Sequence, residues 1–211
     1  MDDTETSSPA DFDPEAIRLA IVSDDPAQAL PALVGLRKLE AEQAVPLLLL
    51  GLEQEPFIVR SISCAGLGVK RNEAGWSALV EALQGDEDAN VRAEAANALA
   101  NYGLERAWPL LRESFQRDDQ WLVRCSILSA LAEQPQIDPQ VLLELARMAV
   151  AVADGSVRVG GAEILSRVVR EAAPSNQTPG QAAEVARELL RGLQQDADHR
   201  VVAAALNGLQ A

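Results

Sequence analysis

Apolar residues recur along the chain at helical spacing, in paired segments that short acidic turns separate. Recurrence every three to four residues is typical of amphipathic helices that bury one face. The first helix of each pair, here called an A helix, is predicted at 14–22, 43–52, 75–84, 105–116, 139–152 and 181–194. The second, a B helix, is predicted at 26–39, 57–70, 89–102, 121–133, 156–172 and 200–209. Turn signals such as Asp24-Asp25-Pro26 and Asp154-Gly155 lie between the two helices of a pair.

A Val-Arg dipeptide opens four of the predicted B helices. The four dipeptides, Val59-Arg60, Val91-Arg92, Val123-Arg124 and Val157-Arg158, follow one another in steps of 32, 32 and 34 residues. A fixed period of this size indicates stacked copies of one helix pair, each burying its apolar face against its neighbours. The sequence therefore predicts an all-α protein, a right-handed α-solenoid of about six helix pairs over residues 14–211.

Two segments fall outside this pattern. Residues 1–13 are acidic and rich in Ser and Thr, and we expect a disordered lead-in there. The stretch 173–180 combines Pro, Gly and polar residues, and we expect a surface loop within the solenoid.

The four arginines of the dipeptides predict a structural ladder. Arg60, Arg92, Arg124 and Arg158 each follow a turn that contains an acidic residue: Glu55, Asp88, Asp119 and Asp154, respectively. A guanidinium group forms fork-shaped ion pairs with carboxylates, so we expect these acids to be the partners that tie the repeats together. A basic stripe for an anionic ligand is the alternative, and the acidity of the chain argues against it.

The B-helix positions two and six residues after the repeated Val are expected to face the concave side of the solenoid. They offer a small, mildly polar surface on which a helix or loop of a protein partner could dock. The candidate partner-binding residues in these slots are Ser61, Asn97, Cys125, Ser129 and Glu163.

Two aromatic residues, Phe57 and Trp121, stand two positions before the repeated Val. They are candidates for exposed aromatics on one rim of the solenoid, where such residues often anchor interfaces. A role as hydrophobic staples at the helix starts is the alternative.

Composition and charge limit the classes of molecule that this protein is expected to bind. Eighteen basic and thirty-two acidic residues give a formal net charge of −14. Nucleic acid is not an expected partner, because a duplex carries a phosphate charge every ~1.7 Å along its axis. An anionic membrane is disfavoured for the same reason, and no apolar run is long enough for a membrane span. With no visible signal peptide and two isolated cysteines, the sequence predicts a cytoplasmic protein.

Residues that carry chemistry are scarce. Cys64, Cys125 and the single histidine, His199, are too few and too scattered for the four ligands of a structural zinc site. No Gly-rich phosphate loop and no distinct nucleophile–base arrangement can be identified. We therefore predict no metal, no cofactor and no catalytic residue, and a protein that is not an enzyme.

The segment 88–99, in which an acidic turn and Val91-Arg92 open an Ala-rich helix, resembles the short HEAT repeats named after phycobilisome lyases. The resemblance covers about residues 14–211, and the strings at 55–61 and 118–124 are similar to cyanobacterial members in particular. It implies an α-solenoid, while repeats of this kind serve many unrelated functions.

The resemblance implies two candidate functions. One is a non-enzymatic adaptor or assembly factor, similar to the HEAT protein that associates with an A-type iron–sulfur carrier. The alternative is a subunit of a phycobilin lyase, or a phycobilisome-associated chaperone, acting on bilin attachment or detachment; no bilin-specific motif can be matched. Two other activities of HEAT-like proteins are not expected here. Deoxyhypusine hydroxylases hold two irons through His-Glu pairs, which this chain lacks. HEAT-like DNA glycosylases need a basic concave face, whereas this chain is acidic.

Overall fold

A computed structural model describes residues 13–172 and 180–210, and within these ranges it contains twelve α-helices, one short 3-10 helix and no strand. The A helices are α1 (Pro14–Ile21), α3 (Ala41–Leu52), α5 (Glu73–Gly85), α7 (Leu104–Arg117), α9 (Pro139–Val150) and α11 (Gln181–Leu193). The B helices are α2 (Pro26–Gly35), α4 (Phe57–Val69), α6 (Ala89–Ala100), α8 (Trp121–Ala132), α10 (Gly155–Ala172) and α12 (His199–Gln210), with η1 (Leu36–Lys38) after α2.

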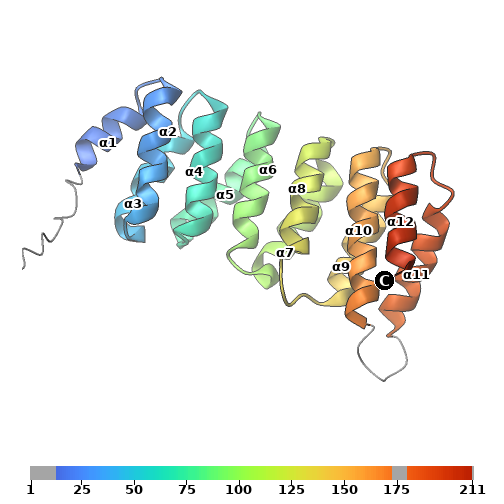
Figure 1. Cartoon of the computed structure of the whole chain (residues 1–211). Helices are drawn as coiled ribbons and strands as arrows, with labels where there is room; N and C mark the ends of the chain where they lie inside the picture. Colours follow the sequence, from blue (N-terminus) through green and yellow to red (C-terminus); the bar gives the residue numbers. More distant parts are fainter. Residues whose placement is uncertain (1–12, 173–179, 211) are drawn as a thin grey trace, which may run out of the picture.

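The helix pairs stand one after another in a single elongated array (Figure 1). The predicted all-α solenoid of about six pairs is confirmed. The predicted lead-in lies outside the described residues except for Asp13, and the predicted surface loop lies outside them except for Gly180. No helix in the described parts of the chain is long and apolar enough to cross a membrane.

Several helix starts are fixed by an aspartate followed by proline. The Asp13 carboxylate accepts hydrogen bonds from the backbone amides of Glu15 and Ala16, and Asp25 and Asp138 cap α2 and α9 in the same way. Proline fits directly after such a cap, because the first helical residue has no intrahelical partner for an amide hydrogen. These local signals set where the helices begin before any tertiary contact forms.

The core consists of the same slots in successive repeats. The repeated Val of five B helices is buried: Val59, Val91, Val123, Val157 and Val201. The Leu eight residues after the first four of these is also fully buried: Leu67, Leu99, Leu131 and Leu165. Because each slot faces its counterpart in the neighbouring pair, the core is one continuous layer rather than a central cluster.

Small residues bring the B helices close together. In α6, Ala93, Ala95, Ala96 and Ala98 are buried, and a Cβ on Gly68 of α4 would lie 2.9 Å from the Cα of Ala98. Adjacent B helices contact each other far more extensively than adjacent A helices do. The B helices are therefore the more closely packed of the two layers.

Candidate functional site

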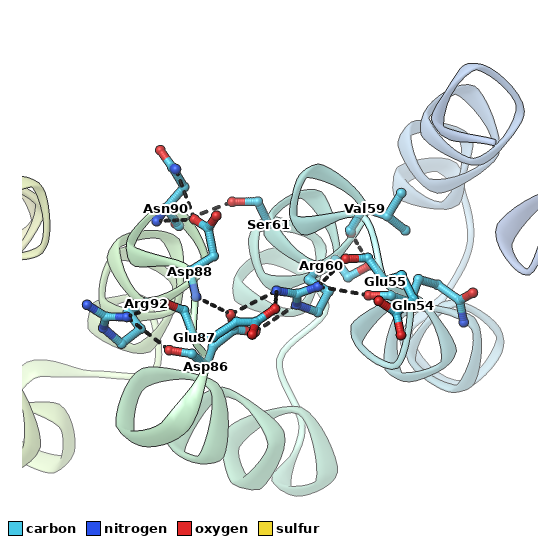
Figure 2. Close-up of polar contacts among 11 residues, drawn as sticks. Gln54, Glu55, Val59, Arg60, Ser61, Asp86, Glu87, Asp88, Asn90 and Arg92 are labelled. Atoms are coloured by element: carbon cyan, nitrogen blue, oxygen red, sulfur yellow. Dashed lines mark hydrogen bonds and ion pairs between the residues drawn. The ribbon is translucent and has the colours of Figure 1, made fainter. Parts of the chain in front are cut away.

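Arg60 joins two successive turns of the solenoid (Figure 2). Its Nε and Nη2 donate to the two carboxylate oxygens of Asp86 at 2.8 and 3.0 Å, and its Nη1 donates to the backbone carbonyls of Gln54 and Glu55. The side chains of Arg60 and Asp86 are each 11% exposed. One guanidinium thus holds its own turn through carbonyls and the next turn through a carboxylate.

Two further arginines repeat this arrangement. Arg92 binds Asp118 at 2.6 and 3.2 Å, and Arg158 binds Asp196 at 2.8 and 2.9 Å. Each also donates from Nη1 to two carbonyls of its own turn. The receiving aspartate is always five residues before the Val slot of the next pair.

The partners predicted for the ladder were wrong. Asp88 and Asp154 accept hydrogen bonds from backbone amides at the starts of α6 and α10, so they cap these helices. Asp119 accepts only from the side chain of Gln120, and Glu55 meets Arg60 through its backbone carbonyl. The guanidinium binds the carbonyls of its own turn through Nη1, so its Nε and Nη2 face the acid of the following repeat.

Two of the ladder aspartates, Asp118 and Asp196, have lowered pKa values. Burial raises the pKa of Asp118, but the hydrogen bond from Arg92 and another from the Gln120 amide outweigh this, and the net pKa is lowered. The hydrogen bond from Arg158 lowers the pKa of Asp196, and the amide of Asp198 adds to the effect. Each carboxylate therefore binds an arginine and its own turn at once.

The ladder is interrupted at Arg124. The acid slot of the following pair, five residues before Val157, holds Val152. Arg124 makes no ion pair with any described residue, and it instead donates from Nε to the carbonyl of Phe115 while its guanidinium lies 5.8 Å from that ring's centroid. The two B helices at this junction, α8 and α10, contact each other less than their neighbouring B-helix pairs do.

Three grooves of the B-helix face lie over α4 to α10, and a fourth, over α2 and α4, shares Ala65 and Val69 with the first of them. The first, of about 300 Å³, lies over α4, α6 and α8, and the second, of about 380 Å³, lies beside it and shares Glu94 and Asn97. The third, of about 320 Å³, lies between α8 and α10 and shares Cys125 and Ser129 with the second. The shared residues make the three grooves one continuous depression along four B helices.

The predicted partner-binding residues of the B face line this depression. Ser61 and Asn97 lie in its α4–α6 part, Cys125 and Ser129 in the middle, and Glu163 at the α10 end. Ser129 and Glu163 are exposed, and the other three are half-buried. Whether they contact a partner stays a prediction.

The two rim aromatics do not line any of these grooves. Phe57 is 43% exposed and Trp121 is 51% exposed, and each is the first residue of its B helix. They lie at the N-terminal ends of α4 and α8, with α6 between these helices, and not among the groove-lining residues.

Glu94 is a groove residue that our sequence analysis did not single out. It lines both of the first two grooves, one position beyond the slot occupied by Ala93, and it is half-buried. Burial raises the pKa of its carboxyl group. A signal was present, because an acid within the otherwise Ala-rich α6 interrupts an apolar run.

The cysteines show no sign of reactivity. Burial raises the pKa of the Cys64 thiol to about 12, and burial also raises that of Cys125. A raised pKa disfavours the thiolate, which is the nucleophile and the metal ligand. Among the described residues, no three His, Cys, Asp or Glu side chains form a group that could hold a metal ion.

Comparison with known proteins relates the helix pairs of this chain to a known type of repeat. A family model described as HEAT repeats matches residues 45–132, which run from within α3 to the end of α8. This stretch therefore carries HEAT repeats, in an all-helical solenoid. No curated protein matches the chain.

Two solved structures are similar in architecture. The complex of CpcE and CpcF of phycocyanin lyase from Nostoc sp. PCC7120 shares 21% sequence identity, with 94% of this chain and 100% of that chain covered and a TM-score of 0.42. Human deoxyhypusine hydroxylase in complex with glycerol shares 15% identity, with 93% and 96% covered and a TM-score of 0.49. At such identities and scores, neither similarity carries a function over to this chain.

The interrupted rung can be tested by replacing Val152 with aspartate. We expect Val152→Asp to pair with Arg124 and a double-mutant cycle with Arg124→Gln to give a favourable coupling of about 1–2 kcal/mol, typical of a charged hydrogen bond. Denaturant unfolding of the four proteins provides the measurement. Val152→Asn, which has the same shape but no charge, is the matched control, and equal coupling for Asp and Asn would contradict the ion pair.

The lowered pKa of Asp118 predicts a pH dependence of stability. A carboxyl group whose pKa is lower in the folded chain than in the unfolded chain stabilises the fold above its unfolded pKa of ~3.9, and loses this contribution as the pH falls through the folded pKa. The free-energy difference between the wild type and Asp118→Asn should therefore shrink from pH 5 to about pH 2. Its neighbour Asp119, which forms no ion pair with an arginine in the described parts of the chain, is the control, and an identical pH dependence in Asp118→Asn and Asp119→Asn would disprove the assignment.

Proposed function

We propose that this protein is a non-enzymatic adaptor or assembly factor that binds a segment of a protein partner in the continuous depression along its B-helix face. The observation that carries the proposal is the continuity of the three grooves over α4, α6, α8 and α10. A helix or loop needs an extended trough of this kind, whereas a small substrate needs an enclosed pocket.

The fold suits such a role because its binding face is already rigid. The floor of the depression consists of short side chains on closely packed helices, including Ala93 and Ser126. The hydroxyl of Ser126 donates to the carbonyl of Ala93, and that of Ser61 to the carbonyl of Asn90, so neighbouring B helices are joined on this face. A preorganised surface loses little conformational entropy when a partner binds.

The exposed aromatics fit the same proposal as anchors at the rim. Trp121 and Phe57 present large apolar surfaces at the first residues of α8 and α4, outside the grooves. Aromatic side chains of this kind often dominate binding energy at protein interfaces.

The more specific statements about the origin, partner and location of this protein rest on the sequence resemblance alone. A cyanobacterial origin, an association with an A-type iron–sulfur carrier and a cytoplasmic location stay predictions. The same holds for the alternative, a subunit of a phycobilin lyase or a phycobilisome-associated chaperone that acts on bilin attachment or detachment.

Arginine substitutions in the groove test the adaptor proposal. We expect Asn97→Arg or Ser129→Arg to reduce partner capture from native extract at least about tenfold, because a long charged side chain fills the trough. Quantitative affinity capture with mass spectrometry provides the measurement. Gln43→Arg adds the same charge to an exposed position of α3 in the A layer, and it should leave capture unchanged. Capture that survives both groove variants would overturn the proposed site.

The bilin alternative has a direct optical test. Under the adaptor proposal, mixing the protein with phycocyanobilin should leave the visible absorbance of the pigment unchanged, with or without candidate partner subunits. A shifted absorbance band that follows the protein through gel filtration would instead support the lyase or chaperone alternative.

A further inference from the structure

Glu94 stands out among the acids of the B face because its side chain is half-buried and is not paired with a basic residue. In the part of the chain that the structure describes, no Lys or Arg side chain binds its carboxylate, which faces the open groove over α4, α6 and α8. Burial is the one resolved cause of its raised pKa, with no offsetting positive charge. A carboxylate in this situation gains free energy when a cation reaches it.

No Lys or Arg side chain lines the two grooves around Glu94, and the guanidinium of Arg71 donates to the carbonyl of Asn101 at the end of the first groove. The two grooves over α4, α6 and α8 are lined by Glu94 and Glu133 as their charged residues, and neither Lys nor Arg is among the lining side chains. Small and polar residues, including Asn97 and Ser129, form the remainder of the surface. The open trough is therefore negative along these three helices.

The arginines of the B face are placed elsewhere. Arg167 and Arg170 line the third groove, at α10, and Arg167 is already bound to carbonyls at the end of α8 and to Glu171. The ladder arginines Arg60 and Arg92 are bound to Asp86 and Asp118. Neither set offers Glu94 a partner from within the chain.

We propose that the partner segment that binds over α4, α6 and α8 is basic, and that a Lys or Arg side chain of this segment forms an ion pair with Glu94 in the groove. The inference rests on the proposed function, since it names the chemistry of the segment that the adaptor binds. Glu133, exposed at the end of α8, lies in the same groove and adds to the attraction. The overall charge of −14 favours a basic partner anywhere on the surface, so the test must isolate this position.

Two synthetic peptides serve as probes. Both are amphipathic Ala/Leu-rich helices; one carries two lysines four residues apart and the other carries glutamines at the same positions. We expect the lysine peptide to bind the full chain about tenfold more tightly at low salt and to shift amide signals of α6 and α8 in heteronuclear NMR spectra.

Substitution of Glu94 isolates the residue from the general field. Glu94→Gln should reduce the affinity for the lysine peptide to that for the glutamine peptide, and Glu94→Asp should restore part of it. Glu113→Gln removes the same charge from an exposed position of α7 and should leave the affinity unchanged. Circular dichroism and thermal unfolding check that each variant is folded.

The titration of Glu94 provides a second readout. Its side-chain carboxyl carbon should titrate above the ordinary pKa of a glutamate in the free protein, and saturation with the lysine peptide should lower that pKa. Equal binding of the two peptides, no binding of either, or equal losses in Glu94→Gln and Glu113→Gln would overturn the inference. If Asn97→Arg abolishes partner capture while Glu94→Gln does not, the adaptor proposal stands and the basic segment is rejected.

Discussion

The close stacking of the B helices is the constraint on which the rest of this structure depends. Buried alanines in α6 and the glycine at position 68 leave no room for larger side chains between neighbouring helices. The arginine ladder adds a polar constraint to this apolar one, since each complete rung joins consecutive turns through a carboxylate and two carbonyls. Apolar contact between helices sets the spacing between repeats. The ion pair of each guanidinium fixes the orientation of neighbouring repeats at the N-terminal ends of their B helices.

This stacking also determines the shape and chemistry of the face that we propose for binding. Because the Val and Leu slots of each B helix are used inside the core, only the slots between them face outward, and these hold small or polar side chains. A trough with short side chains over several helices suits an extended protein segment, and its shape is fixed before a partner arrives. The negative charge of this trough comes from Glu94 and Glu133, because Arg60 and Arg92 are bound to the ladder aspartates Asp86 and Asp118.

The array is not uniform along its length. Val152 replaces the acid of one rung, Arg124 turns back to Phe115, and α8 and α10 contact each other less than α6 and α8 or α10 and α12 do. The third groove lies between these same two helices, although neither Arg124 nor Val152 lines it.

The sequence by itself determined the helix pairs, their period and the buried slots, because amphipathic spacing and capping residues act within a few positions of the chain. It also placed Ser61, Asn97, Cys125, Ser129 and Glu163 in outward slots, as B-helix geometry requires. Only the tertiary structure decided the ladder partners, because Arg60 and Asp86 are 26 residues apart and meet through the stacking of two turns. It alone decided that Glu94 is half-buried in a groove that no Lys or Arg lines, since desolvation depends on the neighbouring helices and not on local sequence.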